Sequence, residues 1–444
     1  MKKRLIYSLV VSVLALNVVF GAQRYLLSAE SDAKNDVYGN LRLFSIVLER
    51  VRQDYVDGDQ LTYQDLIHGA LQGMLNTLDP HSEFLDAQKY GELKKDTEGS
   101  FGGVGIQVGV RGDFLTVIAP IDDTPASRAG VMSGDRIIKI DGRNTERLGL
   151  QDAVKLLRGE PGSSVNLTLM RPSGGTVLEV TLERENIKVE TVRDINGKGE
   201  FPLGEDKIGY VRLTQFGENS SRELSVALKK LQEQGLEGLI LDLRDNPGGL
   251  LDQAAQVCDR FLPAKTLVVS TEGRDPSERR EFRSTGRDLI PKLPVVVLVN
   301  GGSASASEIV AGSLQDLKRA VIVGEKTFGK GSVQSIIPLP GGCAVRLTTA
   351  KYYTPSHKVI HEEGITPDII VPMAPEETEA VFLKRTPGLV ESLDSDRQER
   401  LRTAQDVQLE RAVDLLKGIN LFTQRDGEAS KSAKLTRPPK MSLN

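Results

Sequence analysis

The sequence contains little histidine, cysteine or tryptophan. Its 444 residues include four histidines, two cysteines and no tryptophan. Two cysteines cannot form a disulfide framework or a C-x-x-C metal site, and the apolar neighbours of Cys258 and Cys343 indicate small core residues. Apolar residues make up 39% and charged residues 27%, which is ordinary for a soluble globular protein. The net charge of -4 gives no general attraction to nucleic acid, so no nucleic-acid partner is expected.

The few histidines leave little choice for a metal site or a histidine base. His68 and His81 lie in an N-terminal segment with a helical pattern, and His357 and His361 are spaced i, i+4 in "SHKVIHEEG". A zinc pair at this spacing requires a helix, but nearby Thr-Pro and glycine favour a turn, and no third ligand stands out. We therefore expect no metal and no other cofactor.

The N-terminus has the pattern of an export signal. "MKKR" precedes "LIYSLVVSVLALNVVFGA", which carries no charge. A basic start and an apolar run of this length predict a signal peptide or a single membrane anchor over 1–22. The protein is therefore expected to be exported to the periplasm or cell envelope, either released or anchored.

Length and patterning predict several domains in an α/β multidomain protein. The N-terminal segment has an apolar stripe at helical spacing, which must pack on the same chain or on a partner. Strands that alternate with helices predict a mixed sheet with covering helices. The polar composition at the end of the chain predicts disorder. The expected segments are a helical segment at 36–97, short strands and glycine turns at 100–186, the mixed α/β core at 206–372, charged helices at 376–417 and a disordered tail at 424–444.

The second segment resembles a PDZ domain. The resemblance rests on "GSFGGVGIQVGV" and "TPASRAGVMSGDRIIKIDG". The glycines let consecutive amides converge on an anion, such as the C-terminal carboxylate of a peptide, and "IQVGV" offers an edge for β-augmentation. The helix "LQDAVKLLRG" would form the other wall of the groove. The expected peptide-binding residues are Gly103, Val104, Gly105 and Ile106.

Three alternating serines follow two glycines in "VNGGSASASEIVAGSLQD". Of Ser303, Ser305 and Ser307, Ser305 lies where a strand and turn lead into a helix. Two interpretations are open for Ser305. It forms a capping box with Glu308 and has no chemical role, or it is a nucleophile beside amides that stabilise an oxyanion.

A second junction between a strand, a turn and a helix favours the interpretation of Ser305 as a nucleophile. "GLILDLRDNPGGLLDQ" again reads as strand, tight turn and helix. It presents the amides of Gly248 and Gly249 at a helix N-terminus, opposite the amide of Ala306. Two such glycine-containing turns in one domain indicate an active site in which backbone amides stabilise an oxyanion.

A nucleophilic serine needs a base to accept its proton, and a lysine is the remaining candidate for this base. Lys330 lies between two glycines at the start of a β run, where Lys330, Ser332 and Gln334 would share one face and Gln334 would hold the amine. Burial lowers the pKa of a lysine from roughly 10.4 toward 7–8, so that its neutral amine can deprotonate a serine. A solvated loop lysine is the alternative.

Together these motifs resemble the carboxyl-terminal processing protease family. "DLRDNPGG", "NGGSASASEIVAGSLQD", "GEKTFGKGSVQ" and "GITPDI" occur in this order after the PDZ segment, and the resemblance covers roughly 36–372. It implies an ATP-independent serine endopeptidase with Ser305 as nucleophile, Lys330 as base and Gln334 orienting the lysine. Ala306 and one of Gly248 and Gly249 match the family's oxyanion hole.

The resemblance also implies partners and regulation. Polypeptides bound by their C-termini would be the substrates, the N-terminal and C-terminal helices would form a homodimer, and an envelope adaptor is a further expected partner. Arg158 ends the helix beside the peptide groove. It would sense whether a peptide occupies the groove and regulate the activity of the protease domain accordingly. The alternative is that Arg158 only interacts with the helix dipole.

Other functions fit the sequence less well. "GEKTFGKGS" nearly matches a nucleotide-binding P-loop, but Gly331 takes the place of the required Ser or Thr, and a strand is expected where the P-loop needs a helix. A catalytically inactive PDZ scaffold would not need Ser305, Lys330 and Gln334 together. Asp316 follows Ser305 by about three helical turns, roughly 16 Å along the axis, so we expect it to be structural.

Overall fold

The structure is a computed structural model. It describes residues 36–97, 100–111, 114–121, 124–132, 134–146, 148–171, 176–188, 190–287, 290, 293–384 and 395–435. The predicted signal or anchor at 1–22 lies outside these residues, and no helix within them is long and apolar enough to cross a membrane. The chain divides into two compact units, one ending at Phe84 and one beginning at Leu85.

The first unit is helical, as its apolar periodicity predicts. Its elements are α2 (Val37–Asp54), the 3-10 helix η1 (Gly58–Gln60), α3 (Tyr63–Asn76) and the start of the short strand β1 (Glu83–Leu85). Within the described chain α2 buries none of its residues, and Leu41, Phe44 and Val47 are among its exposed side chains. An apolar stripe of this kind is typical of a helix that packs against a partner.

A small β domain with PDZ topology begins the second unit, after helix α4 (Ala87–Thr97). Its sheet has the order β3 (Ile106–Arg111), β4 (Phe114–Pro120), β5 (Arg136–Ile140), β7 (Ser164–Arg171) and β8 (Thr176–Glu183), with β6 (Arg143–Asn144) paired to β5. A separate pair joins β2 (Ser100–Gly103) to β9 (Glu185–Lys188), and the helices are α5 (Pro125–Arg128) and α6 (Leu150–Leu157). Alternate residues of the strands, such as Val165, Leu167 and Leu169, fill one core.

The predicted α/β core is built on a mainly parallel sheet. Its strands, in spatial order, are β10 (Val192–Arg193), β11 (Ile208–Leu213), β12 (Gly238–Asp242), β15 (Val295–Val299), β16 (Val321–Gly324) and β19 (Ile369–Ile370). Only β10 is antiparallel to its neighbour, so the sheet is mixed, as predicted. Every residue of β12 and β15 is buried, which explains their continuous apolar sequences.

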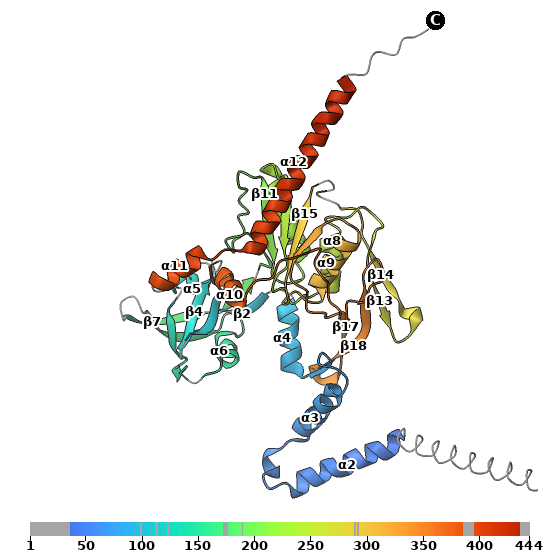
Figure 1. Ribbon diagram of the computed structural model, residues 1–444. Helices are drawn as coiled ribbons and strands as arrows, with labels where there is room; N and C mark the ends of the chain where they lie inside the picture. Colours follow the sequence, from blue (N-terminus) through green and yellow to red (C-terminus); the bar gives the residue numbers. More distant parts are fainter. Residues whose placement is uncertain are drawn as a thin grey trace, which may run out of the picture. The chain divides into compact units, whose positions relative to one another are not determined.

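Helices cover both faces of this sheet (Figure 1). The helices α7 (Ser220–Glu233), α8 (Leu251–Cys258) and α9 (Ala306–Asp316) share the larger core with alternate strand residues. On the opposite face, Ala412 and Leu416 of α12 (Val407–Leu435) pack against Ile240 and Val296. The carboxyl ends of the parallel strands therefore meet at one edge, where ligands usually bind in such sheets.

One strand departs from the predicted order. The alternation of strands and helices predicted a single sheet for this segment, but β13 (Leu267–Gly273) belongs to a separate antiparallel sheet. There it pairs with β14 (Arg280–Arg283) and β18 (Ala344–Tyr353), and β18 pairs with β17 (Ser332–Pro338). A short buried apolar run fits either kind of sheet, so periodicity alone could not separate them. The 3-10 helices η2 (Pro276–Glu278) and η3 (Pro340–Gly342) lie in the connections.

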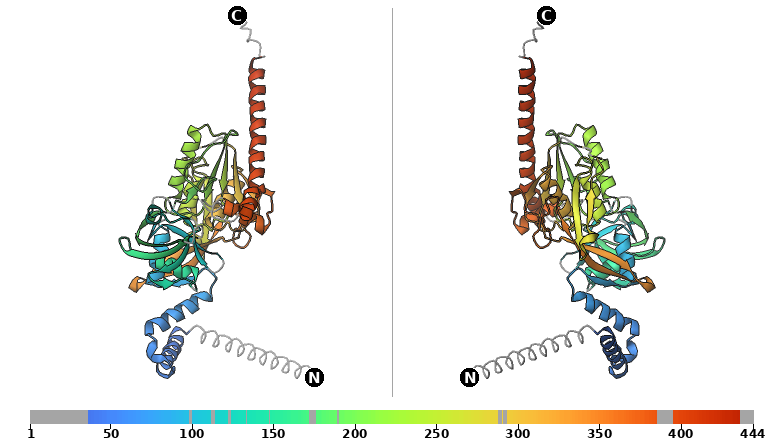
Figure 2. Two further views of the ribbon diagram at one scale, coloured as in Figure 1. Left: turned by 90° about the vertical axis from the view of Figure 1, so that its left-hand side faces the viewer. Right: turned by 90° about the vertical axis from the view of Figure 1, so that its right-hand side faces the viewer.

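The C-terminal region is helical and longer than predicted. It contains α10 (Pro375–Lys384), α11 (Ser395–Thr403) and α12. The prediction of disorder from residue 424 is wrong as far as Leu435, because α12 continues to that residue and extends beyond the sheet (Figure 2). The polar composition was misread as disorder, although its glutamate, lysine and alanine residues favour a helix. Residues 436–444 lie outside the described part.

Candidate active site

Ser305 lies at the junction between β15 and α9. It is the N-cap of α9, is 6% exposed, and has φ 56 and ψ -113. N-cap residues normally have extended backbone, and a positive φ strains any residue other than glycine. Helix capping alone does not require this conformation. The predicted capping box between Ser305 and Glu308 is present, and the strain favours a further, functional role for Ser305 beside it.

The two neighbouring serines have structural roles. The Ser303 hydroxyl donates to the Leu243 carbonyl at 2.8 Å and accepts the Asn300 N–H at 3.0 Å. The Ser307 hydroxyl donates to the Asn246 carbonyl at 2.9 Å. Both side chains are fully buried, so their hydroxyls are committed to the backbone of the opposite turn.

The Ser305 hydroxyl instead contacts a buried tyrosine. Burial raises the pKa of Tyr352, while a hydrogen bond with the Ser305 side chain acts in the opposite direction. The Tyr352 N–H donates to the Gly331 carbonyl at 2.8 Å, which ties β18 to the loop that carries Lys330. Tyr352 is a site residue that the sequence analysis missed, since nothing in "AKYYTP" distinguishes it from a core aromatic.

Glycine is required at the turn after β12. Gly248 has φ 102 and Gly249 has φ 145. A Cβ on Gly248 would lie 2.8 Å from the Ser305 Cβ and 2.9 Å from the Ala306 nitrogen, so this backbone lies directly against the turn that carries Ser305. The Gly248 N–H already donates to Asn246 Oδ1 at 2.9 Å. Among the described residues, the amides of Gly249 and Ala306 have no hydrogen-bond acceptor.

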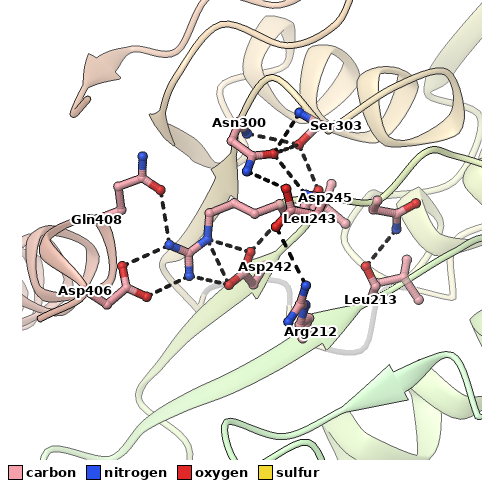
Figure 3. Close-up of polar contacts among 12 residues, drawn as sticks. Arg212, Leu213, Asp242, Leu243, Asp245, Asn300, Ser303, Asp406 and Gln408 are labelled. Carbon is pink, nitrogen blue, oxygen red and sulfur yellow. Dashed lines mark hydrogen bonds and ion pairs between the residues drawn. The ribbon is translucent and has the colours of Figure 1, made fainter. Parts of the chain in front are cut away.

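Side chains join the two glycine turns to each other (Figure 3). The Asp245 N–H donates to Asn300 Oδ1 at 2.9 Å, and the Asn300 amide donates to Asp245 Oδ1 at 2.8 Å. The Ala304 N–H donates to the Asn246 carbonyl at 3.0 Å. These contacts, with those of Ser303 and Ser307, set the position of Gly249 relative to Ser305.

A buried arginine connects the same turn to the C-terminal region. The Arg244 guanidinium donates to both carboxylate oxygens of Asp406 at 2.9 Å, and it donates to both oxygens of Asp242 on its other side. Gln408 of α12 also accepts from it at 3.1 Å (Figure 3). The sequence analysis missed this link because Asp406 lies 162 residues from Arg244 and no local pattern relates them.

Lys330 lies in the loop that leads into β17. Its side chain is half-buried, and this burial, reinforced by the nearby Arg346, lowers the pKa of the amine, while Glu308 acts in the opposite direction. A Cβ on Gly331 would lie 2.1 Å from the His361 nitrogen, so the following glycine permits a close backbone approach. Among the described residues, no hydrogen bond joins the Lys330 amine to Ser305 or to Gln334.

Gln334 lies near the start of β17, beside Ser332. Its Nε2 donates to the Ser332 hydroxyl at 2.9 Å and is 3.4 Å from the Thr348 hydroxyl. A register shift between Val333 and Gln334 interrupts the regular alternation on which the prediction relied. Ser332 and Gln334 nevertheless contact each other. The orienting role of Gln334 toward Lys330 stays a prediction.

Glu308 links the loops of Ser305 and Lys330. Its carboxylate is fully buried and accepts the N–H groups of Ser305 at 2.8 Å and Lys330 at 2.9 Å through Oε2. Oε1 accepts the Thr327 hydroxyl at 2.5 Å and the Gly329 N–H at 2.7 Å. Burial raises the pKa of Glu308, and these hydrogen bonds oppose that rise. The sequence analysis considered this residue only as a helix cap.

The other candidates from the sequence lie in structural contacts. Asp316, at the end of α9, accepts the Ser356 N–H at 3.0 Å and pairs with Lys358 at 2.9 Å, as its predicted structural role requires. His357 Nε2 lies 2.9 Å from Glu272, and within the described residues no group of three or more His, Cys, Asp or Glu is placed to hold a metal ion. His361 Nε2 lies 3.8 Å from Glu362.

The two cysteines and the near P-loop also behave as predicted. Cys258 and Cys343 are buried and unpaired, and burial raises the pKa of Cys258 to about 12, which keeps it as an unreactive thiol. The strand β17 follows the "GKG" motif directly. Because a P-loop requires a helix at this point, the nucleotide-binding interpretation is excluded.

The predicted carboxylate-binding loop is shorter than its glycines suggested. Gly102 and Gly103 belong to β2 and pair with β9, so they are strand residues rather than members of a converging loop. The carbonyls of Val104 and Gly105 accept the N–H groups of Ala126 and Ile121, and Gly105 has φ 75. Ile106 begins β3, which lies at the edge of its sheet. An edge strand is the element that β-augmentation needs.

Arg158 is the C-cap of α6, as predicted from "LLRG". Its guanidinium carbon lies 4.5 Å from the centre of the Phe101 ring, a cation–π distance. It lines a cavity of about 180 Å³ together with Lys155 of α6 and with Gln88 and Glu92 of α4. The regulatory role of Arg158 stays a prediction.

Comparisons with known proteins agree with the motifs. The model of peptidase family S41 matches residues 207–371, and a PDZ domain model matches residues 116–171. The carboxy-terminal-processing protease of Bartonella bacilliformis is 46% identical over 360 residues, which cover 80% of this chain and 80% of that protein. The carboxyl-terminal-processing protease of Picosynechococcus sp. is 41% identical, over 73% of this chain and 77% of that protein.

A solved structure shares the fold. That of a candidate S41 protease from Bacteroides fragilis has a TM-score of 0.50 and 18% identity, covering 84% of this chain and 97% of that chain. At this identity the likeness concerns the fold alone. With the sequence matches, the findings give a serine-type peptidase, and the chain belongs to the S41 family of carboxy-terminal processing proteases.

Proposed function

We propose that this protein is an ATP-independent endopeptidase that captures polypeptides by their C-termini and cleaves them with a Ser305/Lys330 dyad. The observation that carries the proposal is the meeting of the two glycine turns. The strained Ser305 lies against Gly248, and the amides of Ala306 and Gly249 lack acceptors among the described residues. Such amides at a helix N-terminus stabilise a developing oxyanion.

The proposed reaction begins with the neutral Lys330 amine. The amine accepts the Ser305 proton as Oγ attacks the peptide carbonyl carbon, and the resulting oxyanion accepts hydrogen bonds from Ala306 and Gly249. The ammonium of Lys330 then protonates the leaving amine, which leaves an ester on Ser305. Water, deprotonated by Lys330, hydrolyses this ester and restores the serine.

The lowered pKa of Lys330 supports its role as the base. Half-burial disfavours the ammonium, so the amine is neutral at a lower pH than that of an exposed lysine. In this proposal the long side chain turns toward Ser305 for catalysis, and Gln334 holds the amine there. Because Nε2 of Gln334 donates to Ser332, its Oε1 is the atom that would accept a hydrogen bond from the amine.

The PDZ domain supports the proposed capture of C-termini. Its edge strand β3 can accept an extended peptide, and the proposal places the terminal carboxylate at Val104 and Gly105, which connect β2 to β3. We assign the protein to the periplasm or cell envelope from its N-terminal pattern. A homodimer through the terminal helices and an envelope adaptor are further proposed partners, and the exposed apolar residues of α2 support the first of these.

The test is proteolysis of a denatured or C-terminally tagged protein by the purified full chain. Wild-type protein should cleave it without ATP, and Ser305→Ala should not. A chelator should leave cleavage unchanged, because a lysine base requires no metal. Equal cleavage by Ser305→Ala would reject the dyad, and loss of activity with chelator that zinc restores would favour His357 and His361 instead.

A further inference from the structure

Glu308 accepts hydrogen bonds from the two loops that carry the proposed nucleophile and base. One donor, the Ser305 N–H, comes from the start of α9, and the Lys330 N–H comes from a loop 22 residues away from Glu308 in sequence. Both donate to the same oxygen, Oε2. The distance between the two catalytic backbones is therefore set through a single atom.

A charged carboxylate is specifically suited to this place. All the groups facing it that form hydrogen bonds are donors: three N–H groups and the Thr327 hydroxyl. A carboxylate offers only acceptors, whereas a glutamine amide would direct its own N–H₂ at some of these donors. Burying an ionised group is costly unless it is fully hydrogen-bonded, and here each oxygen accepts two hydrogen bonds.

Another buried carboxylate of the same core, that of Asp194, accepts hydrogen bonds in a purely structural role. Asp194 accepts the N–H groups of Asn196, Lys198, Glu200 and Phe201. All of these donors belong to the loop that directly follows Asp194. Glu308 differs because its donors come from two separate segments, and each segment contains one member of the proposed dyad.

We propose that Glu308 is a positioning residue, which aligns Ser305 with Lys330 by holding the backbone of both. This inference rests on the proposed Ser/Lys function. Its carboxylate does not touch the substrate. It acts through the backbone, and also through its charge, because it is the nearby anion that favours the protonated form of Lys330. Loss of the alignment should slow acylation without changing substrate capture.

The charge around Lys330 provides a readout that a structural role would not affect. Glu308 of α9 favours the ammonium, and Arg346 of β18 disfavours it. Removing the anion should therefore lower the pKa of Lys330 further and move the acidic limb of the pH–rate profile to lower pH. Removing the cation should move that limb to higher pH.

The experiment measures kcat, KM and the pH profile of the purified full chain on a C-terminally tagged protein. Glu308→Gln should lower kcat by roughly 10- to 100-fold with little change in KM, and shift the acidic limb to lower pH. Glu308→Asp keeps the charge but shortens the side chain, so kcat should fall while the limb stays near that of wild type. Arg346→Gln should shift the limb in the opposite direction.

A matched control is available in Asp259. This carboxylate is 6% exposed and likewise accepts a threonine hydroxyl, that of Thr285 at 2.6 Å, and the N–H groups of Thr285 and Gly286. Asp259→Asn should lower thermal stability but leave kcat and the pH limb unchanged. This variant shows the effect of losing a buried carboxylate that accepts similar hydrogen bonds but lies elsewhere in the core.

The outcomes separate this inference from the proposed function. If Ser305→Ala is inactive while Glu308→Gln keeps wild-type kcat and pH limb, the positioning role is wrong and the dyad stands. If Ser305→Ala keeps its turnover, the dyad and the inference both fail. If Glu308→Gln does not fold, the decision passes to Glu308→Asp, for which an unchanged kcat would overturn the inference.

Discussion

The protease core and the PDZ domain both contain a glycine-containing turn to which we assign a role in the proposed function, but they support it differently. In the core, buried side chains such as Asn300, Ser307 and Glu308 hydrogen-bond the backbone of each turn. In the PDZ domain, the loop before β3 is held through the carbonyls of Val104 and Gly105, and β3 is left at the sheet edge.

The proposed function accounts for this difference. The proposed acyl transfer requires nucleophile, base and oxyanion donors to be held within fractions of an ångström, which the fixed hydrogen bonds of the core would provide. Capture of varied peptides requires a free backbone edge and tolerance of different side chains. We therefore expect small changes in the core turns to remove the chemistry, and changes in the PDZ domain to affect turnover of whole substrates.

The largest expected effect is that of changing the base. Lys330→Arg should be inactive, because arginine stays protonated and cannot accept the Ser305 proton. In the wild type, the lowered pKa means that activity is present above it and is lost as the pH falls through it, when the amine becomes charged. The measurement is cleavage rate against pH, with Lys326→Arg on the exposed part of the same loop as control. Full activity of Lys330→Arg would exclude a lysine base.

Crowding the oxyanion turn should have nearly as large an effect. Gly248→Ala places a methyl group 2.8 Å from the Ser305 Cβ, so we expect a fall in kcat of roughly 100-fold. Gly235→Ala is the control, because Gly235 also has a positive φ of 90 but a Cβ there meets nothing within 4 Å. Both variants carry the same kind of backbone strain. Equal activity in the two would show that the turn does not need its close approach to Ser305.

A smaller effect is expected from the C-terminal link. Asp406→Asn weakens a buried ion pair with Arg244, which should cost about 1–3 kcal/mol of unfolding free energy. Turnover should fall only modestly, because Asp242 still holds the arginine. Denaturant unfolding measures the first effect and kcat the second. Asp206→Asn, which breaks an exposed pair with Lys417, should change stability little, and equal effects of the two would contradict the structural role of the buried link.

The smallest effect on the chemistry should come from the PDZ domain. Arg158→Ala should slow cleavage of a folded, C-terminally tagged protein while leaving tag binding and Ser305 acylation by a small reagent nearly unchanged. Lys155→Ala, in the same helix and lining the same cavity, is the matched control. Tag binding is measured by titration with the tag peptide. Turnover equal to wild type in Arg158→Ala, beside an inactive Lys330→Ala, would leave this arginine as a helix cap.

The core elements could be predicted because their sequences carry strong local signals. The runs "GLILDL" and "PVVVLVN", each followed by two glycines, predict two strands and two turns, and the second turn places Ser305 at a helix start. The sheet to which β13 belongs could not be predicted, because both sheets bury a similar apolar run. The end of α12 was misjudged from polarity alone.

The parts of the site that escaped prediction depend on long-range contacts. Glu308 appears in the sequence as a helix cap, and its contacts with Gly329 and Lys330 arise only when the loop before β17 folds back onto α9. Tyr352 and the Arg244–Asp406 pair are likewise products of packing. The Gly248 N–H donates to Asn246 Oδ1, a contact that the sequence did not predict and that favours Gly249 as the proposed oxyanion donor.

The central claim is that Ser305 is a nucleophile activated by Lys330. Its most direct test is covalent labelling by a small serine-reactive phosphonylating reagent, with the modified residue identified by mass spectrometry. The account predicts an adduct on Ser305 in the wild type and in Ser303→Ala and Ser307→Ala, at a rate that rises with pH through the lowered pKa of Lys330, and little labelling in Lys330→Ala. An adduct on another residue, or equal labelling of Ser305 in Lys330→Ala, would contradict it.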